Sequence, residues 1–194
     1  MIRRRTSWTG IDLFTMLFLT AMVIAYLLLP LINPPAEEDA KADPVGNIVV
    51  SVSWPVGDVD IDTWVFGPGE TRPVGYSNRN GKVFSLIKDD LGNPDNDLNY
   101  EAVISRGTPA GRYWINLHAF RASTYPIKVK VTVDVHTGDN GKGMKKIVTT
   151  EVVLDHYGDE RTAFSFELTD NGALVPGTTN NLFKPLRAAN VGAL

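Results

Sequence analysis

The chain has 194 residues, with 19 Lys and Arg against 22 Asp and Glu, and it contains no cysteine. Disulfide scaffolds, thiolate zinc sites and cysteine catalysis are therefore excluded. A hydrophobic fraction of 43% and a charged fraction of 21% are typical of a soluble domain with a sizeable core. The charges are unevenly distributed, however, and their distribution divides the chain.

The N-terminal segment is first basic and then apolar. Arg3, Arg4 and Arg5 open the chain, and no charged residue occurs between Asp12 and Glu37. About 20 helical residues span about 30 Å, the thickness of the hydrocarbon core of a bilayer. With the positive-inside rule, this predicts a bacterial inner-membrane protein with residues 1–10 in the cytoplasm, a transmembrane helix over 11–32 and the remainder in the periplasm.

The same segment has a second interpretation, a cleaved secretory signal peptide. Ala40, Lys41 and Ala42 form a small-x-small sequence of the kind that signal peptidase cleaves. Against this, the apolar run is longer than a signal-peptide core, the cleavage sequence lies far beyond it, and Asp12 stands at its start. An uncleaved membrane anchor therefore fits the sequence better.

Beyond the apolar run the pattern changes to strands and turns. Residues 33–45 are rich in Pro, Ala and charge, which predicts an exposed linker. In 127–135, Ile and Val alternate with polar residues, as in a half-buried antiparallel strand. We predict an all-β periplasmic domain over 46–177, an antiparallel β-sandwich of Ig-like or jelly-roll-like type, and a weakly ordered tail over 178–194. The predicted strands are 47–54, 61–66, 82–87, 100–105, 112–120, 127–135, 146–154 and 162–168.

Asp12 is the residue that most needs an explanation. A carboxylate at the edge of the hydrocarbon is unfavourable unless it faces a protein interior or a water-filled path. In one interpretation Asp12 caps the N-terminus of the helix. In the other, the helix continues back through Trp8 and leaves Asp12 one to two turns inside, with Thr15 and Thr20 on the same face.

The stretch 7–19, SWTGIDLFTMLFL, resembles the single helix of the B subunits of ion-driven motors, the flagellar stator and biopolymer-transport family (MotB, ExbD and TolR type). The resemblance implies that Asp12 is the ion-carrying carboxylate and that Thr15 and Thr20 line its path. A proton is the expected ion, because no cluster of oxygen ligands accompanies Asp12, and Thr15 leaves sodium open as the alternative. It also implies a self-dimer inside a ring of a polytopic partner subunit of the MotA/ExbB type, five partner copies to two of this chain.

The periplasmic part does not resemble the α/β domains of that family. The stretch 54–69, WPVGDVDIDTWVFGPG, followed by GYSN at 75–78, is similar to an uncharacterised bacterial β-sandwich domain of the YfaP-like type. This resemblance implies a fold and little about function. The periplasmic target of the domain therefore stays unknown.

Two acidic segments are candidates for a calcium site. Alternate residues of an extended strand project to the same face, so the three aspartates of residues 58–62 are expected to lie on one face. The loop 89–99 is dense in carboxylate and amide oxygens, the ligands that calcium prefers. Two interpretations stay open, a calcium-stabilised domain and solvated turn residues, and no other cofactor is expected. The candidate ligands are Asp58, Asp60, Asp62, Asp89, Asp90, Asp95 and Asp97.

The sequence contains no recognisable catalytic constellation. His118, His136 and His156 lie on different predicted elements without metal-ligand spacing, and neither a nucleophile elbow nor a phosphate-binding loop occurs. Residues 35–194 carry 16 basic against 21 acidic residues, which argues against nucleic acid as a partner. The sequence therefore predicts a protein that is not an enzyme.

Two functions stay open. The first is a subunit of an ion-driven rotary motor that transmits ion motive force through its helix to a periplasmic β-sandwich. The alternative is a membrane-anchored β-sandwich that binds calcium or a glycan, or serves as a scaffold, without ion transport. Three tryptophans are expected in the core or at its edge, where an exposed pair would stack on a sugar ring: Trp54, Trp64 and Trp114.

Overall fold

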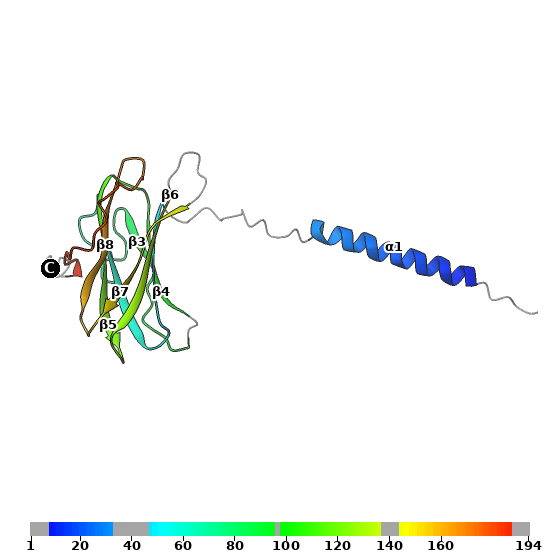
Figure 1. Cartoon of the computed structure of the whole chain (residues 1–194), viewed down its shortest axis with the longest axis horizontal. Helices are drawn as coiled ribbons and strands as arrows, with labels where there is room; N and C mark the ends of the chain where they lie inside the picture. The colour runs from blue at the N-terminus through cyan, green and yellow to red at the C-terminus, as the bar shows by residue number, and fades with distance from the viewer. Residues whose placement is uncertain (1–7, 33–46, 96–97, 137–143, 188–194) are drawn as a thin grey trace, which may run out of the picture. The chain divides into compact units, whose positions relative to one another are not determined.

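The computed structural model of the protein describes residues 8–32, 47–95, 98–136 and 144–187. The chain divides into two compact units, residues 1–42 and 43–194, and each is described by itself. The first contains one helix and the second an antiparallel β-domain, as Figure 1 shows. The prediction of an N-terminal apolar helix followed by a β-domain is thus confirmed.

The helix α1 spans Trp8–Ile32. Its segment Ile11–Leu28 has a mean hydropathy of 2.2 and is long and apolar enough to cross a membrane. A membrane anchor and a signal sequence both satisfy this description. The side of the membrane on which the β-domain lies stays a prediction from the arginines.

The β-domain is built from strands joined by turns and loops, the longest of which, 67–83, lies between β2 and β3. The described residues form β1 (Ile48–Trp54), β2 (Val59–Phe66), β3 (Phe84–Lys88), β4 (Asn99–Ser105), β5 (Gly111–Ala122), β6 (Ile127–His136), β7 (Met144–Leu154) and β8 (Glu160–Leu168). Each corresponds to one of the predicted strands.

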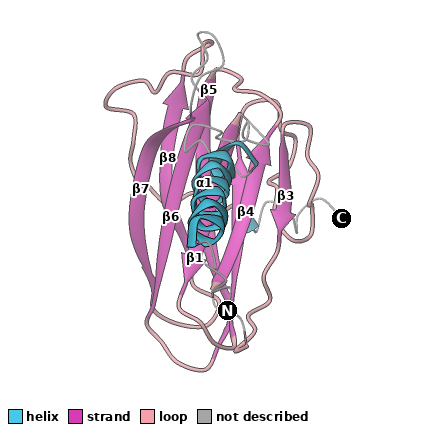
Figure 2. Ribbon diagram, turned by 90° about the vertical axis from the view of Figure 1, so that its right-hand side faces the viewer, coloured by secondary structure: helices cyan, strands magenta, loops and turns pink. Residues whose placement is uncertain are grey.

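The strands form two antiparallel sheets. One contains five strands in the order β3-β4-β1-β6-β7, which Figure 2 shows side by side, and the other three in the order β2-β5-β8. One cluster of buried side chains combines residues of both sheets, among them Val131 of β6, Ile61 of β2 and Leu117 of β5. The two sheets therefore share a hydrophobic core. The Ig-like or jelly-roll-like type of the domain stays a prediction.

Strand β6 shows why alternation was a reliable guide. Ile127, Val129, Val131, Val133 and Val135 are all buried, whereas the residues between them are exposed or half-buried. Because successive side chains of a strand point to opposite faces, this strand covers the core with one face only. The alternation predicted for 127–135 is confirmed.

The starts of four strands, β2, β3, β7 and β8, each lie two residues from the predicted ones, and hydrogen bonds mark the first two. β2 begins at Val59, two residues earlier than predicted, and the carbonyl of Val59 accepts a hydrogen bond from Trp54 Nε1 at 2.8 Å. β3 begins at Phe84, two residues later than predicted. The backbone N–H groups of Lys82 and Val83 donate to the carboxylate of Glu70 at 3.0 and 2.7 Å. These two residues therefore bond to a side chain and not to the backbone of a neighbouring strand.

The segment 178–187 also differs from the weakly ordered tail that the sequence predicts. The backbone of Asn180 pairs with Ser165 of β8, at N···O distances of 2.6 and 3.0 Å. The carboxylate of Glu160 accepts the N–H of Leu186 at 2.9 Å, and the Leu186 side chain is fully buried. Residues 178–187 are therefore part of the folded domain, and 188–194 lie outside the described residues.

Candidate functional site

Asp12 lies inside helix α1 and not at its cap. The helix begins at Trp8, and its first turn contains no acidic residue. The prediction that the helix continues back through Trp8 is confirmed. An N-cap residue precedes the first helical residue, so Asp12 is too far along the helix for the capping interpretation.

The surroundings of Asp12 on the helix supply no partner for its carboxylate. The side chain is exposed, and it makes no hydrogen bond or ion pair with another residue that the structure describes. The hydroxyls of Thr15 and Thr20 donate to the carbonyls of Ile11 and Met16, each at 2.8 Å. Their hydrogens are thus used within the helix, and only their oxygen lone pairs remain for other ligands.

In the β-domain, the two predicted acidic segments come together. Asp60 and Asp62 lie on β2, and Asp89 and Asp90 directly follow β3. The charges of Asp62, Asp89 and Asp90 all act on the carboxyl group of Asp60. With Glu101 of β4 they form a group that we call the acidic cluster: Asp60, Asp62, Asp89, Asp90 and Glu101.

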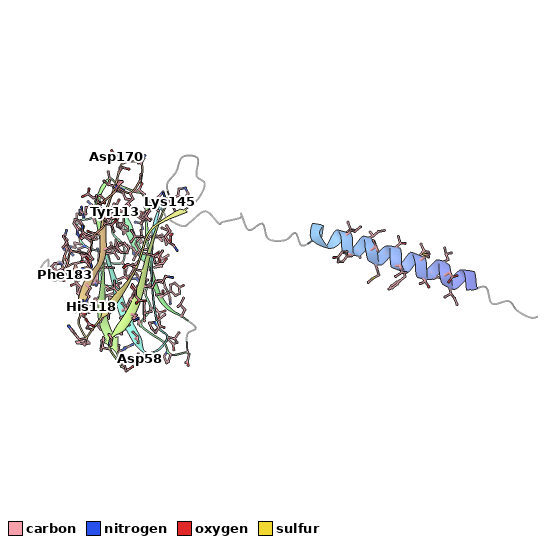
Figure 3. All side chains as sticks on the ribbon, viewed as in Figure 1. Asp58, Tyr113, His118, Lys145, Asp170 and Phe183 are labelled. Carbon is pink, nitrogen blue, oxygen red and sulfur yellow. The ribbon has the colours of Figure 1, made fainter. Side chains whose placement is uncertain are left out.

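The loop after β3 is fixed to the start of β2 by hydrogen bonds and close packing. Arg121 of β5 donates to the carbonyl of Leu91 at 2.7 Å and pairs with Asp58 at 2.9 Å. Gly92 has a φ of +74°, and a side chain there would collide with the backbone of Val59. Glycine is therefore required where the loop meets the strand. Figure 3 shows Asp58 at the end of the domain opposite Asp170.

Glu101 is the member of the acidic cluster that sequence reasoning missed. It is 0% exposed, and its Oε2 accepts the backbone N–H of Thr63 at 2.7 Å, which joins β4 of one sheet to β2 of the other. Its other oxygen, Oε1, is buried without a hydrogen-bond partner among the described residues. The signal in the sequence was the strand period, because Glu101 shares the inward face with Val103.

Asp62 has its own buried partner. The Nδ1 atom of His118 lies 2.9 Å from Asp62 Oδ2, and both side chains are buried. The other ring nitrogen of His118, Nε2, is buried without a hydrogen-bond partner. His118 is thus a core residue that positions Asp62.

Burial changes the acidity of two members of the cluster. It raises the pKa of Asp60 to about 6, with the neighbouring charge of Asp62 as the second cause. Burial also raises the pKa of Glu101 well above its ordinary value. The cluster therefore contains carboxyl groups that bind protons more tightly than exposed ones.

The calcium hypothesis stays a prediction. Within the described ranges, no three Asp, Glu or His side chains are arranged to hold a metal ion. Asp95 is exposed, and its N–H donates to Asn93 Oδ1 at 2.9 Å as in a turn. Asp97 lies outside the described residues. We therefore identify none of these acids as a metal ligand.

Other sequence candidates are structural. Trp54 and Trp64 are buried, so they present no exposed pair to a sugar ring. Trp114 is half-buried, and the ammonium group of Lys184 lies 3.5 Å from its ring centroid. His136 ends β6, and His156 is exposed and bonded to the carbonyl of Tyr157.

Comparisons with protein-family models, with curated proteins and with solved structures found no match for the chain. The resemblances to ion-driven motor subunits and to the YfaP-like domain therefore rest on the residues that carry them.

Proposed function

We propose that the chain is a single-pass subunit of an ion-driven membrane complex and that Asp12 is its ion-carrying carboxylate. The observation that carries the proposal is the position of Asp12, past the first turn of an otherwise apolar helix. Acidic residues at such positions mark ion pathways and proton relays.

A carboxylate in a membrane helix needs polar surroundings. Among the described residues Asp12 has none, and the hydroxyl hydrogens of Thr15 and Thr20 are already bonded within the helix. We propose that the groups that hydrate or pair Asp12 belong to partner chains. The resemblance to motor subunits implies the form of this complex, two copies of the helix inside a ring of five polytopic MotA/ExbB-like subunits, with the β-domain in the periplasm.

The first experiment identifies the partner. The tagged full chain is purified in mild detergent from its native host, and the copurifying proteins are identified and quantified. We expect a polytopic membrane protein at a ratio of about five to two. Recovery of the chain alone, as a monomer or homo-oligomer, would contradict the proposal and favour an anchored β-domain without ion transport.

The second experiment tests Asp12 itself. The purified complex is reconstituted into vesicles, and proton uptake is followed with an enclosed pH-sensitive dye. We expect Asp12→Asn to abolish uptake without reducing the amount of complex, because the amide has nearly the size of the carboxyl group but carries no proton. Asn also caps helices about as well as Asp, so a capping role predicts unchanged uptake.

The matched control is Asp58→Asn. Asp58 is an exposed aspartate of the β-domain, so the same substitution there leaves the helix untouched. We expect this variant to conduct protons like the wild type. Equal loss in both variants would assign the defect to assembly and overturn the role of Asp12.

A further inference from the structure

The acidic cluster contains two buried carboxyl oxygens that accept no hydrogen bond from an N–H group of the described residues. Glu101 Oε1 and Asp89 Oδ1 are both buried, and neither has a donor partner among the described residues. Burial raises the pKa of Glu101, the side chain of Asp89 raises it further, and the side chain of Thr63, whose buried hydroxyl also has no hydrogen-bond partner among the described residues, lowers it. Ionised carboxylates only accept hydrogen bonds, so a hydrogen bond between Glu101 and Asp89 requires that one of the two groups carries a proton.

The neighbours of the two groups indicate which one is protonated. Asp89 Oδ2 lies 3.4 Å from the guanidinium group of Arg79, and the Asp89 side chain is 14% exposed. Glu101 is 0% exposed, and no cation of the described part of the chain is bonded to it. A negative charge is therefore more favourable on Asp89, and a proton on Glu101.

We infer that Glu101 and Asp89 form a proton-binding site, in which the protonated Glu101 carboxyl donates to the Asp89 carboxylate and joins the loop after β3 to β4. The site is part of a hydrogen-bond network. Arg79 donates to Asp89, Glu101 donates to Asp89, and the N–H of Thr63 donates to Glu101.

Charged groups from each neighbouring element surround this site. β2 contributes Asp60 and Asp62, and the segment after β3 contributes Asp90 with Lys88, whose Nζ lies 3.5 Å from it. β5 contributes His118, bonded to Asp62, and Arg121, paired with Asp58. The acids outnumber the cations that face them. A second negative charge on Glu101 would therefore be repelled.

The proton links the stability of the domain to pH. Burial holds the pKa of Glu101 in the folded state above its unfolded value of about 4.5. The folded state therefore binds more protons than the unfolded state, and its stability falls as pH rises from about 4.5 through the folded pKa. Above that pH, the ionised pair repels and the bond between loop and strand is lost.

The test uses the full chain in mild detergent with EDTA, and it follows thermal unfolding by tryptophan fluorescence between pH 5 and pH 9. Glu101→Gln keeps the size and a hydrogen-bond donor but removes the titration. We expect the wild-type Tm to fall with pH and the variant to fall less, so that the variant exceeds the wild type by at least about 3 °C at pH 9. The control Glu151→Gln, at an exposed position of β7, follows the wild type.

Two outcomes would overturn the inference. If Glu101 is ionised, Glu101→Gln lowers Tm by the same amount at every pH. If a cation occupies the site, added CaCl₂ raises the wild-type Tm and the variant loses that increase.

A second measurement avoids dependence on the variant's folding. The wild-type chain in D₂O at pH 7.5, above the pKa of about 6 of Asp60, should show the infrared C=O stretch of a protonated carboxyl group. This band should disappear at higher pH together with the loss of Tm. Its absence at pH 7.5 would contradict the inference whether or not the variant folds.

Discussion

The acidic residues of the two units are in opposite situations. Asp62 and Glu101 are buried in the β-domain, and each has a partner from its own domain, His118 at 2.9 Å and the N–H of Thr63 at 2.7 Å. Asp12 lies in a helix apolar enough to cross a membrane, without a bonded partner among the described residues. The fold explains the partners of Asp62 and Glu101, whereas no contact with a described residue explains Asp12.

This difference also separates structural from transport roles. A carboxylate that is fixed by bonds within its domain stabilises one arrangement of the chain. A carboxylate that its own chain leaves unbonded is free to exchange an ion with a partner or with water. The comparison therefore supports looking for transport at the helix and for pH-dependent stability in the β-domain.

The largest effect is expected when a partner of a buried acid is removed. His118→Ala leaves the Asp62 carboxylate buried without its bonded ring nitrogen, and we expect a loss of about 3 kcal/mol in the free energy of unfolding. Urea denaturation of the full chain in detergent, followed by tryptophan fluorescence, measures it. His156→Ala is the control, because His156 is exposed. If His118→Ala lost no more stability than the control, the contact between His118 and Asp62 would not stabilise the β-domain.

A smaller loss is expected at the tail. Leu186→Ala removes a buried side chain from the β-domain, and we expect it to cost about 2 kcal/mol by the same urea measurement. Leu182→Ala is the matched control, because Leu182 is 74% exposed, and it should lie within about 0.5 kcal/mol of the wild type. Equal small effects would show that the tail is not part of the folded domain.

The tail also shows where prediction from the sequence ends. The helix and β6 were predictable because each depends on a local pattern, an apolar run in one and strict alternation in the other. Residues 178–187 have no such pattern. Their order depends on Glu160, whose carboxylate accepts the N–H of Leu186 from 26 residues along the chain.

The acidic cluster was predictable in four of its five members and not in its geometry. Asp60, Asp62, Asp89 and Asp90 were candidates because aspartates in strands and turns are conspicuous, but their meeting depends on the packing of a loop against β2. Glu101 was missed because a single glutamate in a strand is ordinarily solvated. The strand period that places Val103 in the core predicts that the Glu101 side chain also points inward. Its hydrogen bond to Thr63 was not predictable, because that bond joins the two sheets.

The smallest effect is expected from Asp60→Asn, and it depends on pH. Burial raises the pKa of Asp60 to about 6 from an unfolded value of 3.8, so the stability that the protonated group contributes is lost as pH rises between these values. The asparagine variant stays neutral. We expect it to equal the wild type near pH 4 and to exceed it by on the order of 1 kcal/mol at pH 7.5, measured by urea denaturation.

Asp58→Asn provides the matched control, two residues away on the same chain segment. The Asp58 side chain is 61% exposed, and its partner Arg121 keeps its bond to the Leu91 carbonyl when Asp58 is changed. Exposed ion pairs contribute little, so this variant should stay within about 0.5 kcal/mol of the wild type at both pH values. If Asp58→Asn reproduced the pH-dependent gain of Asp60→Asn, net charge and not burial would be its cause. The comparison between buried and exposed acids would then fail within the β-domain itself.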